Sequence, residues 1–282
     1  MRKPFRIALP DGKGLEVGLR TLVVGVLNVT PDSFSDGGLY DQPGPAIEHA
    51  LQMQADGADL IEVGGESTRP GSVRVSAEDE LARLQPVLSA LGKRLHIPIA
   101  VDTYKSEVAR AAIDLGASLI NDISALRFDP RIAEVAARSR SALILMHMRG
   151  EPATMQQMAP SPDIFAEIDR DMHLAVREAE ARGVSRAQLI IDPGIGFGKT
   201  VEQNLAILNH LGRLASFDLP LLIGTSRKRF IGALTGRDET ERVFGTAASV
   251  AAAILRGAHL IRVHDVREIV DAVRVADAIV AA

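Results

Sequence analysis

The sequence contains no cysteine and no tryptophan, and only 4% of its 282 residues are aromatic. The lack of cysteine excludes disulfide bonds, thiol nucleophiles and thiolate metal sites, and it suits a reducing compartment, so we expect a cytoplasmic protein. The scarcity of stacking side chains, together with a net charge of -4, argues against nucleic-acid binding. Any anionic ligand must therefore be met by a local group of basic residues.

Long apolar runs are missing as well. The longest, Val243 to Leu255, is too short to cross a bilayer and is rich in Ala, Gly, Ser and Thr. The first twenty residues mix Arg, Lys, Asp and Glu without an apolar block, so we expect neither a signal peptide nor a membrane anchor. With 46% hydrophobic residues and no Pro/Ser/Gly-rich linker, the chain is expected to form one domain over residues 1–282.

Short buried-strand patterns alternate along the chain with segments of helical periodicity. The expected strands are Leu22–Leu27, Ala58–Val63, Ile97–Val101, Ser118–Asn121, Ala142–Met146, Leu189–Ile191, Leu221–Ile223 and His259–Val263. Helical spacing is clear in Ala46–Ala55, Ala77–Leu91, Ser106–Leu115 and Ile164–Ala181. Such alternation without linkers predicts a parallel sheet of the α/β class, and eight units favour a (β/α)8 TIM barrel over an open doubly wound sheet.

The segment before the first buried strand has a different pattern. Phe5 to Val17 reads as two short alternating segments around Pro10-Asp11-Gly12-Lys13-Gly14. Turn residues between two such segments predict a β-hairpin. We expect this N-terminal hairpin to plug the bottom of the barrel.

Polar residues stand at or just after the end of each expected strand. They are Asn28, Glu62, Asp102, Asn121 with Asp122, His147, Asp192, Thr225 to Lys228, and Arg262 with His264. The carboxyl ends of barrel strands converge on one face, where active sites of this fold are built. Taken singly, Asp102 or Asp192 could cap the next helix, and His264 could be a structural histidine. Their recurrence at eight matching positions favours one functional site.

Common catalytic motifs are not found among these residues. The stretch Asp192 to Thr200 looks like a phosphate-binding loop, but the first glycine of that motif would fall at Pro193, and the glycines are too close together for a dinucleotide fingerprint. There is no His-Glu-x-x-His helix and no Gly-x-Ser-x-Gly elbow, so zinc hydrolysis and a serine nucleophile are unsupported. What remains is a recognition site.

The strand-end residues divide into two chemical halves. Asp102, Asp192 and Asn121 make an acidic half, and Arg69, Arg262 and His264 make a basic half, with Lys228 available to either. Carboxylates suit the N–H groups of a heterocycle because an ionised carboxylate accepts parallel hydrogen bonds, whereas basic side chains suit phosphate oxygens. A ligand with a heterocyclic end and a phosphorylated end would satisfy both halves.

Seven sequence blocks together resemble the dihydropteroate synthase family, the folate-pathway enzymes that sulfonamides target. The blocks are Asn28-Val-Thr-Pro-Asp-Ser-Phe-Ser-Asp-Gly-Gly38, Gly64-Gly-Glu-Ser-Thr-Arg-Pro-Gly71, Val101-Asp-Thr-Tyr-Lys105, Asn121-Asp-Ile123, Asp192-Pro-Gly-Ile-Gly-Phe-Gly-Lys199, Ser226-Arg-Lys228 and Arg262-Val-His-Asp265. They follow the family's order, and the first two are highly specific. The resemblance implies a transferase that condenses 6-hydroxymethyl-7,8-dihydropterin pyrophosphate with 4-aminobenzoate, giving 7,8-dihydropteroate and pyrophosphate.

The resemblance also implies roles for individual residues, carried over position by position. Asp102, Asn121, Ile123, Met146, Asp192, Gly224 and Lys228 would bind the pterin. Asn28, Thr68, Arg69, Arg262 and His264 would bind pyrophosphate, with Asn28 also contacting a Mg²⁺ ion. Phe34, Thr68, Pro70, Phe197, Ser226 and Lys228 would surround 4-aminobenzoate. Asp102, Lys228, Arg262 and His264 would be the catalytic residues.

The expected mechanism follows from the lack of a strong base or covalent nucleophile, which an arylamine does not need. The hard step is then the departure of pyrophosphate. We expect a dissociative displacement in which Asp102 stabilises a pterin cation while the basic half and magnesium stabilise the leaving group. The loops Val29–Gly38 and Gly64–Val75 would close over the site and keep water away from the cation.

Two positions carry open questions. Residue 229 is Arg, where many relatives have a Ser that helps to hold the aminobenzoate carboxylate, so that contact is left open. The small apolar segment Val243–Leu255 is typical of a helix packed on the barrel, whereas the resemblance implies that it forms a homodimer surface.

Two rival functions are compatible with a pterin-binding barrel. A pterin-binding methyltransferase of similar architecture would pass a methyl group to a corrinoid partner, and the polar loop that begins at Asn28 argues against it. A non-catalytic paralogue would bind pterin or a partner protein without turnover. The presence of Asn28, Arg69, Lys228 and His264 together argues against that alternative.

Overall fold

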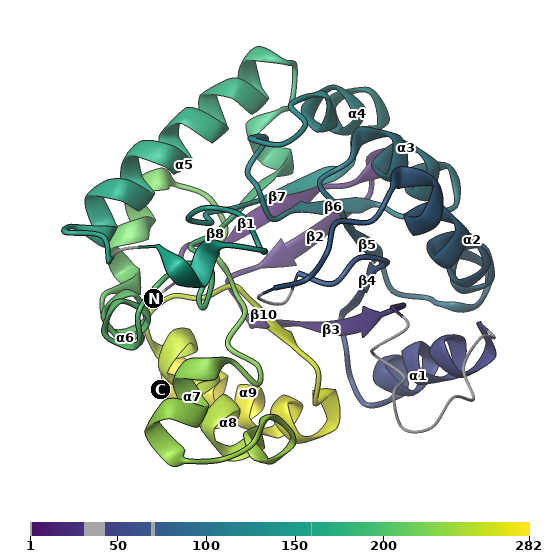
Figure 1. Cartoon of the computed structure of the whole chain (residues 1–282). Coiled ribbons are helices and arrows are strands. Elements are labelled where there is room, and N and C mark those ends of the chain that lie inside the picture. Colours follow the sequence, from purple (N-terminus) through teal and green to yellow (C-terminus); the bar gives the residue numbers. More distant parts are fainter. Residues whose placement is uncertain (1, 31–42, 69–70, 159) are drawn as a thin grey trace.

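Eight parallel strands form a nearly closed ring at the centre of the molecule, and helices surround it (Figure 1). The computed structural model describes residues 2–30, 43–68, 71–158 and 160–282. The strands are β3 (Leu22–Asn28), β4 (Leu60–Gly64), β5 (Ile99–Asp102), β6 (Leu119–Asp122), β7 (Ala142–Met146), β8 (Leu189–Asp192), β9 (Leu222–Ile223) and β10 (Leu260–Val263). Their order is β8-β7-β6-β5-β4-β3-β10-β9, and a bridge between Ile191 and Leu221 joins the two ends. The predicted (β/α)8 TIM barrel is confirmed.

The helices lie between successive strands and cover the outside of the ring (Figure 1). They are α1 (Gly44–Ala55), α2 (Ala77–Arg94), α3 (Ser106–Asp114), α4 (Arg131–Ser139), α5 (Ile164–Ala181), α6 (Val201–Asn209), α7 (Arg229–Thr235), α8 (Val243–Leu255) and α9 (Val266–Ala281). Short 3₁₀ helices occur at Pro10–Gly12, Met155–Gln157, Arg186–Gln188, Leu211–Phe217 and Glu239–Glu241. In α5, the buried residues Ile164, Ile168 and Met172 recur every four residues, so one stripe of this helix packs on the barrel.

Alternate residues of each strand face opposite sides of the sheet and build two separate apolar layers. One layer takes residues from all eight strands and fills the barrel interior: Leu22, Val24, Leu60, Ala100, Leu119, Ala142, Ile144, Ile190, Leu222 and Leu260. The other layer joins neighbours such as Val23, Ile61 and Val101 to the surrounding helices. Continued to the strand ends, this alternation decides which polar residues face the barrel mouth.

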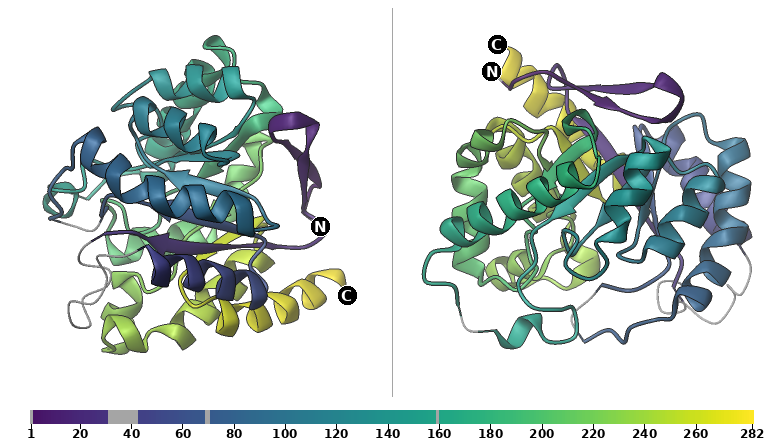
Figure 2. Two further views of the ribbon diagram at one scale, coloured as in Figure 1. Left: turned by 90° about the vertical axis from the view of Figure 1, so that its right-hand side faces the viewer. Right: turned by 90° about the horizontal axis from the view of Figure 1, so that it is seen from above.

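The N-terminal hairpin closes the other end of the barrel. Strands β1 (Phe5–Ala8) and β2 (Gly14–Val17) pair antiparallel, and Ile7, Leu9 and Val17 join the interior apolar layer. Both views of Figure 2 place this hairpin and the two termini at one end, opposite the loops that follow the carboxyl ends of the strands. The predicted hairpin at the barrel bottom is confirmed, and the loops after the carboxyl ends of the strands lie at the opposite end, the barrel mouth.

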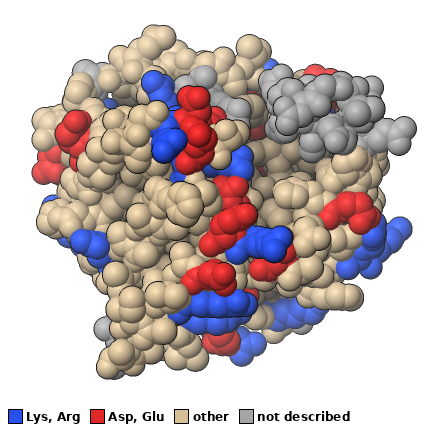
Figure 3. Space-filling view, turned by 90° about the horizontal axis from the view of Figure 1, so that it is seen from below, with Lys and Arg blue, Asp and Glu red and all other residues tan. Residues whose placement is uncertain are grey.

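The surface carries charges of both signs. On the face drawn in Figure 3, Lys and Arg side chains alternate with Asp and Glu side chains. Within the described ranges, no helix has both the length and the apolar character that crossing a membrane requires.

Candidate active site

The strand register sets inward-facing polar residues side by side at the barrel mouth. From β3 to β6, Asn28 pairs with Gly64, Gly64 with Asp102, and Asp102 with Asn121. On the far side, Asp192 of β8 pairs with Met146 of β7. Because neighbouring strands lie only about 5 Å apart, the residues from Asn28 to Asn121 form one row. Asn121 pairs with Ile144 of β7, so Met146 and Asp192 lie two residues further toward the mouth.

Arg262 on β10 crosses the mouth to the acidic side chains of β4 and β5. Its Nε donates to Glu62, and its Nη2 donates to Asp102 Oδ2 at 2.9 Å. Glu62 also accepts a hydrogen bond of 3.0 Å from the Asn121 amide. Burial and then the Glu62 carboxylate raise the pKa of Asp102, and the guanidinium opposes that rise. One cation therefore holds two carboxylates in a largely dry site, where charge-assisted hydrogen bonds are strong.

Asp192 ends β8 and is only 4% exposed. Its Oδ1 accepts from the Gly194 amide at 2.7 Å, which closes the turn after the strand. Gly194 has a φ of 66°, and a Cβ there would lie 1.9 Å from the His147 carbonyl oxygen, so only glycine fits. Burial raises the pKa of Asp192 to about 6, although the Gly194 amide and nearby cations oppose the rise. The remaining lone pairs of the carboxylate can accept from ligand N–H groups.

Lys228 reaches into the mouth from the start of α7. Its Nζ lies 4.1 Å from the centroid of the Phe197 ring, which is a cation–π distance. A Cβ at Gly196 would lie 3.0 Å from Lys228 Cδ, so glycine leaves the lysine its path. Burial and then Arg262 lower the pKa of Lys228 to about 8, which keeps the ammonium mainly protonated at neutral pH.

His264 follows β10 and is fixed by Ser226. The Ser226 hydroxyl accepts from the His264 backbone amide at 3.1 Å and lies 3.0 Å from its Nδ1. Burial and then Arg262 lower the pKa of His264 to about 3, so the ring is neutral in the free protein. Pairing of Nδ1 with the hydroxyl favours the tautomer with the proton on Nε2, which can donate to an anion.

A cavity of about 380 Å³ lies at the mouth. The predicted residues that line it are Asn28, Thr68, Phe197, Gly224, Ser226, Lys228, Arg262 and His264. The cavity is also lined by residues that the resemblance does not assign to a ligand: Val26, Thr30, Ser67, Met155, Arg227, Arg229, Glu239 and Arg242. Three basic side chains, Arg227, Arg229 and Arg242, therefore extend the basic half beyond the predicted residues. An anionic ligand would meet cations on several sides of this cavity.

The other predicted pterin residues are buried beside the cavity wall and do not line it. They are Asp102, Asn121, Ile123, Met146 and Asp192, with exposed fractions of 7%, 2%, 1%, 3% and 4%. Ile123, Met146 and Phe197 belong to one apolar cluster with Tyr104, Met148 and Met155. Thioether, aliphatic and aromatic side chains thus stand next to the acidic groups, as the faces of a flat heterocycle require.

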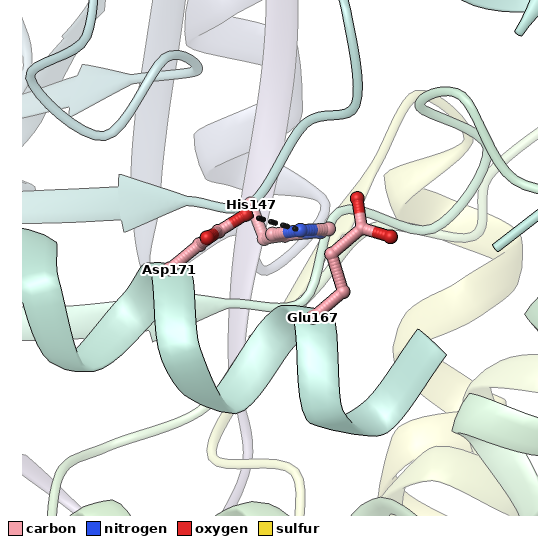
Figure 4. Close-up of side chains that lie close together, drawn as sticks. All are labelled: His147, Glu167 and Asp171. Carbon is pink, nitrogen blue, oxygen red and sulfur yellow. Dashed lines mark ion pairs between the residues drawn. The ribbon is translucent and has the colours of Figure 1, made fainter. Parts of the chain in front are cut away.

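Two polar residues at strand ends do not face the mouth. Asp122 accepts from the Ser124 amide at 2.8 Å and from the Leu126 amide at 2.7 Å, so it holds the turn after β6. His147 points toward α5, where its Nε2 lies 3.6 Å from Asp171 Oδ2 (Figure 4). The expectation that all the strand-end polar groups converge was wrong for these two, because the pleat turns the neighbour of an inward residue outward.

The helix-capping alternative does not apply to the two aspartates. Helix α3 follows its N-cap Lys105, and α6 follows its N-cap Thr200, so neither Asp102 nor Asp192 caps the next helix. Three predicted residues, Phe34, Arg69 and Pro70, lie outside the described residues, as do parts of the loops Val29–Gly38 and Gly64–Val75.

Glu62 is central to the site, although the sequence motifs assign it no ligand. Its side chain is 1% exposed and contacts both Arg262 and Asn121. The available signal was a carboxylate inside the otherwise apolar strand pattern Leu-Ile-Glu-Val-Gly. A buried charge in such a strand requires a partner of opposite charge.

Comparisons with known proteins cover nearly the whole chain. A family model described as pterin binding enzyme matches residues 24–264. Dihydropteroate synthase of Synechocystis sp. is 46% identical over 277 residues, which cover 98% of this chain and 96% of that protein. The crystal structure of Yersinia pestis dihydropteroate synthase with a sulfonamide drug has a TM-score of 0.91 and 42% identity, covering 97% of this chain and 98% of that one. The structure of Xanthomonas albilineans dihydropteroate synthase with 4-aminobenzoic acid has a TM-score of 0.89 and 44% identity, covering 97% of this chain and 98% of that one.

Proposed function

The chain belongs to the dihydropteroate synthase family of pterin-binding enzymes, and we propose that the mouth of its barrel performs the family's reaction. This transferase condenses 6-hydroxymethyl-7,8-dihydropterin pyrophosphate with 4-aminobenzoate, giving 7,8-dihydropteroate and pyrophosphate. The observation that supports the location is the meeting of Asp102 and Asp192 with Arg262, His264 and Lys228 around one mouth. Pyrophosphate release that requires both substrates is the test, and release with only one of them would contradict it.

The pterin end of the substrate is assigned to the acidic half. The buried Oδ1 of Asn121 has no hydrogen-bond partner among the described residues, so it can accept from a ligand N–H. Asp192 offers the remaining lone pairs of its carboxylate, and Ile123 and Met146 would cover the ring faces. Buried acceptors without hydrogen-bond partners destabilise the free protein, so a pterin whose N–H groups donate to them binds more tightly.

The pyrophosphate end is assigned to the basic half, where the family resemblance also implies a Mg²⁺ ion. Asn28 lines the cavity and is only partly buried, so its amide oxygen is available to a ligand there. An uncharged oxygen suits magnesium, which keeps several waters and binds largely through substrate phosphates. The donor chemistry therefore fits, and Asn28 would hold the ion. When bound, magnesium would neutralise charge on the leaving pyrophosphate.

The residues of the chain would act by electrostatic stabilisation. Arg262 and the Nε2–H of His264 would stabilise the departing oxygens, and Lys228 would add a third positive or donor group at the same cavity. Asp102 would stabilise positive charge on the pterin once Arg262 turns toward the pyrophosphate. The dissociative displacement thus separates charge between two preorganised halves.

We predict that Asn28→Ala removes most of the effect of magnesium on pyrophosphate binding. Loss of one contact to a charged group should weaken magnesium-dependent binding about 10- to 100-fold, because such contacts contribute about 1.5–3 kcal/mol. Calorimetry of pyrophosphate with and without Mg²⁺ measures this. A crystal of the wild-type protein with both ligands, showing the ion away from Asn28, would contradict it.

We also predict that 4-aminobenzoate binds measurably only after pyrophosphate or the whole pterin substrate. The loops Val29–Gly38 and Gly64–Val75 are rich in Gly, Ser, Asp and Thr, so we expect the formation of the aminobenzoate slot to cost conformational entropy. Charge-assisted bonds from pyrophosphate to Asn28, Thr68 and Arg69 would supply that free energy and complete an aromatic slot with Phe34 and Pro70.

The expected coupling between pyrophosphate and 4-aminobenzoate is about 5- to 150-fold in affinity, as is typical of two ligands that share a conformational cost. The measurement is a titration of 4-aminobenzoate, or of a sulfonamide, with and without pyrophosphate and Mg²⁺. Equal affinity in both conditions would mean that the slot is preformed.

A homodimer and a cytoplasmic location stay predictions from the sequence and the resemblance. Helix α8 packs on the barrel through Thr246, Val250 and Ile254, as the simpler interpretation expected. It also exposes Phe244 to 86% and Leu255 to 49%, which offers apolar surface for a second copy of the chain.

A further inference from the structure

Two of the sequence blocks carry residues that the described cavity lining does not include: Glu66, Tyr104 and Lys105. Glu66 stands two residues before Thr68, and Lys105 stands three residues after Asp102. Their contacts explain their presence, because they join the two segments that bring Thr68 and Asp102 to the mouth.

The three residues form a buried ionic group with Glu80 of α2. The Lys105 ammonium donates to Oε2 of Glu66 and to Oε2 of Glu80. The Tyr104 hydroxyl donates to the other oxygen of Glu66 at 2.5 Å. The side chains of Glu80, Glu66 and Lys105 are 1%, 8% and 17% exposed, so water screens these charges little.

This ionic group lies at both ends of the segment between β4 and α2. The segment between β4 and α2 contains Thr68, and Glu66 lies at its beginning, while Glu80 lies in the first turn of the helix that follows it. Lys105 therefore binds both ends of the segment at once. Lys105 is also the N-cap of α3 and follows Asp102, the last residue of β5, by three residues. Its ammonium therefore connects the segment after β4 to the end of β5.

Close packing at the start of the segment adds to this arrangement. The Gly65 carbonyl accepts from Arg83 Nη1 at 2.9 Å. A Cβ at Gly65 would lie 2.9 Å from Leu84 Cγ and 3.0 Å from Glu80 Cγ, so the backbone is pressed against α2. The ends of the segment are thus held by contacts outside the cavity.

We infer that Lys105, with Glu66 and Glu80, is a positioning element that fixes the start of the segment after β4, so that Thr68 reaches pyrophosphate and 4-aminobenzoate. The inference rests on the proposed function. Holding both ends of the segment before ligands arrive lowers the conformational entropy lost on binding, which raises affinity without any direct contact to the ligand.

The test is Lys105→Met, which keeps the length of the side chain and removes the ammonium. Three dissociation constants are measured. The first is that of pyrophosphate in the presence of Mg²⁺, the second is that of 4-aminobenzoate in the presence of pyrophosphate and Mg²⁺, and the third is that of 6-hydroxymethylpterin without phosphates. The first two should weaken by about tenfold or more, and the third should stay within about twofold, because Asn121 and Asp192 hold the pterin. Lys105→Arg, which keeps the charge, should restore the first two to within about threefold of wild type.

A matched control is Arg2→Met, which removes a guanidinium that forms an ion pair with Asp277 near the barrel bottom. The Arg2 side chain is also buried, with 3% of it exposed. This variant should leave all three constants unchanged. Equal weakening of all three by Lys105→Met, or an aminobenzoate affinity within about twofold of wild type, would overturn the inference. If Lys105→Met does not fold, Glu66→Gln takes its place with the same expected pattern. A wild-type protein that binds none of the ligands would refute the proposed function instead.

Discussion

Replacing Arg262 by methionine should lower kcat/KM by about a thousandfold and destabilise the fold by about 3–5 kcal/mol. Burial alone would lower the pKa of this guanidinium, but the carboxylates of Glu62 and Asp102 outweigh that effect and raise it. Without Arg262, two buried carboxylates face each other without a counter-ion. In the proposed reaction, the leaving pyrophosphate would also lose the preorganised donor that Arg262 supplies.

The double variant Arg262→Met/Glu62→Gln separates the two losses. Removing one carboxylate should recover much of the free energy of unfolding, measured in urea, because the buried like-charge pair is gone. Catalysis should not recover, because the donor to the leaving group is still missing. If kcat/KM returned together with stability, Arg262 would be a structural residue and not a catalytic one.

Replacing Asp192 by alanine should weaken pterin binding about 100-fold or more while leaving pyrophosphate binding nearly unchanged. Each pterin N–H that loses its acceptor in this dry pocket costs about 1–3 kcal/mol. Asp192→Asn is the matched control, since it keeps an acceptor for the Gly194 amide but loses the charge and one acceptor oxygen. It should share most of the pterin loss. Calorimetry measures the affinities of the variants for pterin and for pyrophosphate. An equal loss of affinity for both ligands would contradict the assignment of Asp192 to the pterin.

The same carboxylate makes pterin binding depend on pH. Because burial raises the pKa of Asp192 to about 6, the ionised form that accepts N–H groups is depleted as the pH falls below that value. The apparent affinity of the wild-type protein should then decrease about tenfold for each further pH unit, and Asp192→Ala should show no such step. A flat wild-type profile through this range would mean that the protonated carboxyl binds pterin equally well.

Much of the architecture followed from patterns local in the sequence. The eight apolar strand patterns, the helical spacing between them and the hairpin signal at Phe5 to Val17 each reflect neighbouring residues alone, and all were confirmed. Five strand ends were placed one residue short, since the last residues of these strands are Asn28, Gly64, Asp102, Asp122 and Asp192. Residue identity also indicated an acidic half and a basic half, because only a few side chains suit N–H groups or phosphate oxygens.

Which polar residues face the mouth was decided by tertiary structure. In Leu119-Ile120-Asn121-Asp122 the apolar residues are buried on both faces of the strand, so the sequence carries no alternation from which the phase of the pleat can be read. The phase is set by packing of Leu119 in the barrel interior, which turns Asn121 inward and Asp122 toward its turn. The same rule turns Met146 toward the apolar cluster of the mouth and His147 toward α5.

The partners of the buried charges also came only from the closed barrel. Arg262 lies 160 residues from Asp102 and 200 from Glu62 along the chain, and Lys105 lies 39 from Glu66, so no local pattern could pair them. The amino-acid sequence by itself determined the strand–helix units and the chemical types available at their ends. Closure of the ring determined which of those charges meet, because residues at equal height on different strands become neighbours only when the sheet curves back on itself.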